Sequence, residues 1–178
     1  LPIHRKIMLW GSGGPFLDGY VLVIIGIALE QLTPVLQLDA RWVGLVGIAT
    51  LVGLFIGTSL FGYIADVLGR RLMFLIDIIA IGVISAATMF VTSPLELVIL
   101  RFLIGIVIGA DYPIATSMIA EFSTTRQRAF TMGFIAAMWY IGATAADVVG
   151  YLLYDVENGW RWMLGSAVIP CIIILLGR

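Results

Sequence analysis

The sequence has very little charge. Only 12% of its 178 residues are Asp, Glu, Lys or Arg, against about 25% in an average soluble domain, and 61% are hydrophobic, against about 45–50%. This composition excludes a soluble domain. A membrane-spanning helix takes about 20 apolar residues, so the chain has room for six spans with short connections and for no large catalytic domain outside the membrane.

Other absences exclude further classes of function. One His and one Cys cannot supply a zinc-type site, so we expect no metal, and the lack of a basic block argues against a nucleic-acid partner. Ser12 stands among glycines, as a nucleophilic serine can, but it would need a His or Lys as general base. His4 precedes the spans and no Lys lies within one, so we expect no enzyme. An ion channel is less favoured, because no repeated filter-like loop is present.

Six apolar segments end at charge, Pro or Gly, and alternate connections between them differ in charge. Arg41 and Arg161 are the basic residues of one side, whereas the other side carries seven. The positive-inside rule therefore places the N-terminus in the cytoplasm. The segments are 7–32, 43–64, 72–92, 95–119, 129–153 and 160–177, and the seven basic residues are Arg5, Lys6, Arg70, Arg71, Arg126, Arg128 and Arg178.

Small residues recur every four positions in three of the expected spans. Such spacing lets helix backbones approach closely inside lipid and predicts a tightly packed bundle. It does not by itself indicate transport, since inert bundles use the same seams. The repeats are Gly53 with Gly57, Gly105 with Gly109, and Gly142 with Ala146 and Gly150.

Two opposite charges fall at similar depth inside expected spans. Asp18 lies about 16 Å from the inner end of the first span, and Arg101 about 21 Å from the inner face in the fourth. A lone charge at mid-membrane costs about 2.5 to 3.5 kcal/mol, so both should face the bundle interior and pair, or line a wet cavity. A static ion pair that ties two helices together is the structural alternative.

The fourth span also carries Asp111 and Tyr112 directly before Pro113, a combination suited to lining a cavity and poorly suited to lipid. The first span likewise combines Pro, Asp and Tyr, a weak echo that points to two three-helix units. Asp77 lies near the inner end of its span and Asp147 lies deeper, and neither has an evident basic partner.

A loop motif connects these features to a known family. The stretch Gly62-x3-Asp66-x2-Gly69-Arg70-Arg71, between the second and third spans, resembles the loop signature of the major facilitator superfamily. Val67 replaces the basic residue usual there. Further likenesses are Arg101-x3-Gly105 in the fourth span, the pair Glu121 and Arg128 as in sugar porters, and Gly109-Ala-Asp111-Tyr112-Pro113 as in phosphate:proton symporters.

The resemblance implies an all-α membrane protein whose six helices form a 3+3 inverted repeat. Residues 1–178 would be the N-terminal half of a twelve-helix transporter, with the C-terminal half absent. The motifs are most similar to those of the sugar-porter-like and YaaU-type metabolite:proton symporters. The function implied is transport of a sugar or an organic or inorganic anion across the cell (inner) membrane by alternating access and proton symport. A proton-independent uniporter is the alternative. The proton gradient replaces any cofactor, and the partners are substrate, proton, bilayer and the missing half.

The resemblance and the charge pattern together assign roles. Asp18 and Arg101 are the expected proton-coupling pair, in which protonation of Asp18 frees Arg101. The aromatic residues of the fifth span could instead serve only in packing. The basic gate residues could instead reflect only the positive-inside rule. The substrate-binding candidates are Tyr20, Asp111, Tyr112, Trp139, Tyr140 and Asp147; the candidates for a cytoplasmic gate are Gly62, Asp66, Gly69, Arg70, Arg71, Glu121 and Arg128.

Overall fold

Helices make up the fold. The computed structural model describes residues 12–122 and 128–177, except the side chains of Ala65, Asp66, Leu68, Arg70, Arg71, residues 114–122 and Arg128. No strand occurs in this part of the chain. The helices are α2 (Gly13–Val35), α3 (Ala40–Leu68), α4 (Arg70–Thr88), α5 (Pro94–Phe122), α6 (Arg128–Leu153), α7 (Gly159–Gly165) and α8 (Val168–Leu176).

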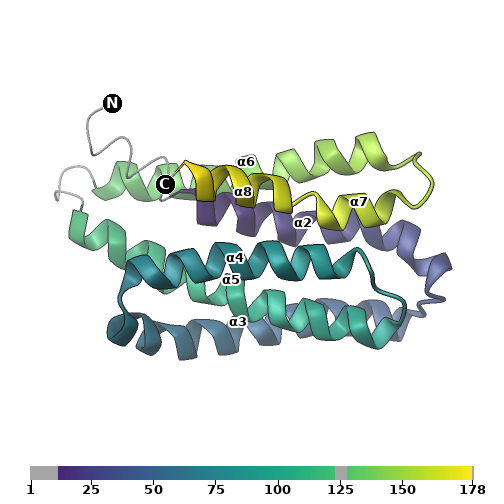
Figure 1. Cartoon of the computed structure of the whole chain (residues 1–178), viewed down its shortest axis with the longest axis horizontal. Helices are drawn as coiled ribbons and strands as arrows, with labels where there is room; N and C mark the ends of the chain where they lie inside the picture. The colour runs from purple at the N-terminus through teal and green to yellow at the C-terminus, as the bar shows by residue number, and fades with distance from the viewer. Residues whose placement is uncertain (1–11, 123–127, 178) are drawn as a thin grey trace.

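The helices lie side by side along the long axis of the molecule (Figure 1). The start of α2 and the end of α8 share one end of the bundle, where Ile174 packs against Gly13. By length and composition, four stretches could cross a membrane: Gly13–Val35, Ala40–Ile64, Ala129–Leu153 and Gly159–Leu176. The apolar part of α4 is shorter, Leu72–Thr88, and α5 has the length but also carries charged side chains.

The packing of the helices follows a two-fold pattern. If α2 to α4 form one unit and α5 to α8 the other, the first helix of each unit lies along the second helix of the other: α2 packs on α6, and α5 packs on α3. The third helix of each unit packs on the first helix of the other unit: α4 packs on α5, and the broken third helix, α7 and α8, packs on α2. The expected 3+3 repeat is thereby confirmed in the arrangement of the contacts.

Glycines make the two long seams possible. A Cβ atom on Gly57 would collide with the Ile106 carbonyl across the α3–α5 seam, and one on Gly142 would collide with the Phe16 carbonyl across the α2–α6 seam. The backbones therefore touch directly, as the four-residue spacing predicted.

The sixth expected span is not one helix, because it breaks between α7 and α8. Pro170 has no N–H to donate to the Ser166 carbonyl, which accepts instead from Ile169 at 3.1 Å, one residue early. The Ser166 hydroxyl in turn donates to the Met163 carbonyl at 2.6 Å. The sequence analysis did not predict this interruption.

Candidate functional site

Four of the charged side chains that the structure describes lie in the apolar interior of the bundle. Asp18 on α2, Asp77 on α4, and Arg101 and Asp111 on α5 are each at most 3% exposed. The other buried side chains of the bundle are mostly apolar, such as Leu17 and Phe74. Since buried charge is expensive, such residues mark functional positions by default in a membrane protein.

Three of the four are acids that gather where α2, α4 and α5 meet. The Asp111 carboxylate lies against Gly14, one helical turn before Asp18 on the same face of α2. A Cβ atom on Gly14 would overlap that carboxylate, so the glycine makes room for it. The charges of Asp77 and Asp111 both act on Asp18, and that of Asp111 also acts on Asp77. We call these three residues the acid cluster.

Arg101 approaches α2 one turn beyond Asp18. Its Nη1 donates to the Val21 carbonyl at 3.3 Å. Within the described part of the chain, Asp18 Oδ1 and Arg101 Nε have no hydrogen-bond partner. The two residues are thus not ion-paired in this conformation, and their role as a proton-coupling pair stays a prediction.

The substrate-binding candidates fall into two groups. Tyr112, Tyr140 and Asp147 are exposed, and Tyr140 makes an edge-to-face contact with Trp139 at 5.2 Å between ring centroids. Tyr20, in contrast, is buried and its hydroxyl hydrogen-bonds Ser166 at 2.6 Å, at the break between α7 and α8.

Trp139 and Asp111 also contact the helix seams. The Trp139 carbonyl lies against Gly19 in the α2–α6 seam, and its side chain is half-buried. Asp111 belongs to the acid cluster, so it faces other acids. Of the candidates, Tyr112, Tyr140 and Asp147 are exposed, Trp139 is half-buried, and Tyr20 and Asp111 are buried.

The end of the bundle opposite Gly13 is joined by polar contacts that the sequence analysis missed. Gln31 on α2 donates to the Tyr154 carbonyl and accepts from the Trp160 amide at 2.7 Å. Tyr154 donates to Glu30 at 3.0 Å, and this bond raises the pKa of the Tyr154 phenol above 10. Arg161 donates to the Met89 carbonyl at 2.8 Å. Gln31, a polar residue at the end of an apolar span, was the feature of the sequence that could have indicated these contacts.

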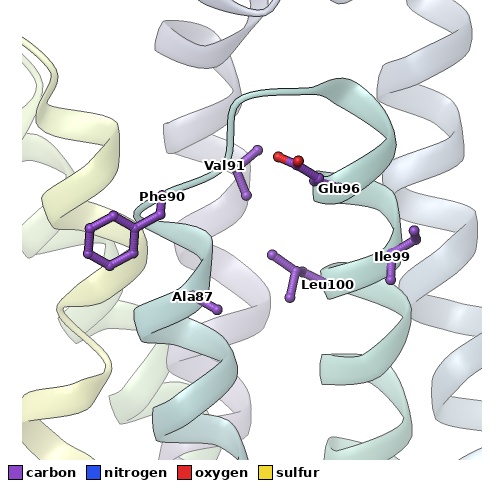
Figure 2. Close-up of a pocket in the computed structure, with 6 residues that line it drawn as sticks. All are labelled: Ala87, Phe90, Val91, Glu96, Ile99 and Leu100. Carbon is purple, nitrogen blue, oxygen red and sulfur yellow. The ribbon is translucent and has the colours of Figure 1, made fainter.

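A shallow depression of about 320 Å³ lies at the turn between α4 and α5 (Figure 2). Apolar side chains and Glu96 line it. The Glu96 carboxylate accepts from the Thr92 amide at 2.9 Å and the Ser93 amide at 3.2 Å, so it caps the start of α5. These contacts assign the residue to helix capping, and the depression is separate from the acid cluster.

Comparison with protein families settles the lineage of the chain. The family described as Major Facilitator Superfamily matches residues 12–177. The chain belongs to this superfamily. Its expected membership is confirmed, and the arrangement of α2 to α8 is the superfamily fold.

Two curated superfamily members of Escherichia coli (strain K12) are similar in sequence. YaaU, named provisionally as a metabolite transport protein, is 78% identical over 99% of this chain and 40% of its own length. The inner membrane metabolite transport protein YgcS is 37% identical over 100% of this chain and 41% of its own length. The chain thus spans about 40% of the length of these relatives.

A solved superfamily structure has the same fold. The proton:xylose symporter XylE, bound to 6-bromo-6-deoxy-D-glucose, matches with a TM-score of 0.88 over 97% of this chain and 43% of its own. The sequence identity is 23%, so the likeness concerns the fold.

The superfamily loop motif explains one backbone feature. Gly69, between α3 and α4, has φ 88° and ψ 135°, a conformation open to glycine. Gly62, at the start of the motif, lies near Pro113 of α5, whose Cβ would be 3.9 Å from an added methyl. The other gate candidates fall outside the described side chains: Asp66, Arg70, Arg71, Glu121 and Arg128.

Proposed function

We propose that this chain is the N-terminal half of a secondary transporter that moves a small polar metabolite across the membrane by alternating access, coupled to protons. The observation that carries the proposal is the acid cluster, which is enclosed within a membrane-spanning bundle. Carboxyl groups that bind and release protons at such a depth can couple a proton gradient to movement of the protein.

Arg101 supports the coupling role of Asp18. It lies on α5 facing α2 and is held by one long bond to a carbonyl among the described residues, so its guanidinium can change partners. In a second conformation it would pair with ionised Asp18, and protonation of Asp18 would release it toward an anionic or hydroxyl-rich substrate.

The exposed candidates support a substrate site completed by other residues. Tyr140, Thr144 and Asp147 project from α6 into open space, and Asp147 is costly to expose to lipid. A second six-helix half packed over this face would cover them and enclose a passage. Tyr112 on α5 is exposed and would line the passage from the other side.

The names of the relatives favour a metabolite substrate. YaaU and YgcS are named for metabolite transport, and XylE for xylose and proton symport. Sugars and organic or inorganic anions are the classes that Arg101 and the exposed tyrosines can bind. We propose a cell inner membrane location with the N-terminus in the cytoplasm.

The test uses the full-length protein in vesicles that enclose a pH-sensitive dye. A screen of sugars, phosphate and aromatic acids for compounds that raise the unfolding temperature supplies the probe. We expect that probe to move protons with it when added to one side. A probe that crosses the vesicle without any change in internal pH would make the protein a uniporter and contradict the proton coupling.

A further inference from the structure

Asp77 is the member of the acid cluster whose own part has not been argued so far, and it is one of the most enclosed charged residues. It lies on α4 between Phe74 and Ile78, both buried, and its own side chain is 3% exposed. Helix α4, which carries it, packs on α5 and on α8. No membrane anchoring or helix capping requires an acid at this position, because Asp77 is seven residues past the start of α4.

The titratable groups around Asp77 are acids and a thiol. Asp111 on α5 acts on it directly, and Asp77 acts in turn on Asp18 of α2 and on Cys171 of α8. Arg101, the buried cation of α5, donates to the Val21 carbonyl. On the α7 side, Arg161 contacts the far end of α4 at the Met89 carbonyl. Among the described residues, no cation therefore compensates Asp77.

The hydrogen bonding of Asp77 is a second observation, independent of the charges around it. Both carboxylate oxygens of Asp77 are buried and make no hydrogen bond to any described residue. One oxygen of Asp18 is in the same situation. An ionised carboxylate without donors in an apolar interior costs several kcal/mol, whereas a neutral carboxyl group costs far less.

The ligand that this arrangement fits is a proton and not a metal ion. Within the described part of the chain, no three His, Cys, Asp or Glu side chains converge closely enough to hold a metal. The acids are near enough to repel one another but do not share a centre. A proton needs one oxygen only and removes the charge that causes the repulsion.

We propose that Asp77 is a second proton-binding residue of this transporter, linked to Asp18 and Asp111 by the repulsion between their charges. A proton bound at Asp77 removes one of the negative charges that repel one another within the cluster, so the apolar interior accommodates the neutral carboxyl group. The proposal rests on the proposed function and adds a second proton site beside Asp18.

The test is infrared spectroscopy of the full-length protein in lipid, in ordinary and heavy water. The wild type should show a protonated carboxyl C=O band that Asp77→Asn loses, while Asp155→Asn, an exposed loop control, leaves it in place. Asp77→Glu should restore a band at a shifted frequency. Identical carboxyl bands in the wild type and Asp77→Asn would overturn the proposal.

Stability and transport separate this proposal from the proposed function. Asn has the shape of a neutral carboxyl group, so the unfolding temperature of Asp77→Asn should match that of the wild type, and a large drop would indicate an ionised, paired Asp77. The spectroscopic result does not depend on turnover. If the wild type failed to move protons with substrate, the proposed function would fail while the Asp77 band could still be measured.

Discussion

At the residue scale, the acid cluster distinguishes this bundle from one held together by packing alone. Asp18 and Asp111 lie on the first helices of the two repeats, and Gly14 leaves space for the Asp111 carboxylate beside α2. The sequence predicted Asp18 as an interior residue from its depth, and Asp111 as a cavity-lining residue from its place beside Tyr112 and Pro113. It could not predict that the Asp111 carboxylate lies against Gly14 of α2, or that Arg101 bonds the Val21 carbonyl, because side-chain direction depends on how the helices pack.

Tyr20 has two competing roles that one substitution separates. Its buried hydroxyl bonds Ser166, so Tyr20→Phe should lower the free energy of unfolding by about 0.5–1.5 kcal/mol and leave the apparent affinity for substrate unchanged. Thermal unfolding and transport kinetics of the full-length protein measure the two effects. Ser166→Ala removes the same bond together with the one to the Met163 carbonyl, so it should cost at least as much. Lost affinity with unchanged stability would make Tyr20 a substrate-binding residue.

At the element scale, the helix seams depend on direct backbone contact. The spacing of small residues in the sequence was sufficient to predict the seams but not the partners across them. The α2–α6 and α3–α5 pairs connect residues far apart in the chain, and a single sequence contains no pairing signal of this kind. The break between α7 and α8 was missed because one proline in an apolar run is weak evidence of an interruption.

The glycine seam makes a prediction about two alanine substitutions on α3. Gly57→Ala would force a methyl group into the Ile106 carbonyl and should destabilise the protein by about 1–3 kcal/mol. Gly47→Ala is the control, since a Cβ atom there meets nothing within 4 Å. It should be neutral or slightly stabilising, because alanine favours a helix by about 1 kcal/mol over glycine. Equal unfolding temperatures for the two variants in detergent would contradict direct backbone contact between α3 and α5 at Gly57.

At the scale of the whole molecule, composition and family motifs were sufficient for the fold. Six apolar segments, a loop motif and a repeated Asp predicted a 3+3 bundle, and the packing of α2 on α6 and of α5 on α3 agrees with it. The substrate site could be predicted only in part. Its candidates Tyr140 and Asp147 are exposed in this structure, and their role in binding substrate stays a prediction.

The orientation in the membrane is a prediction of the charge pattern, and cysteine labelling tests it. With Cys171 replaced by alanine in a cysteine-free background, Asp155→Cys should react with an impermeant maleimide on intact cells, because the proposed topology places its loop outside. Val67→Cys, at the inner end of α3, should react only after the membrane is opened. Both positions are exposed. The opposite labelling pattern would reverse the proposed topology.

The central claim is that a buried carboxyl group, Asp18, couples protons to transport. The most direct measurement compares wild-type and Asp18→Asn full-length protein in vesicles, with the compound identified by the stability screen. Because Asn cannot release a proton, we expect the variant to lose accumulation against a gradient while it still exchanges internal for external substrate. Accumulation by Asp18→Asn to the wild-type level would contradict the account.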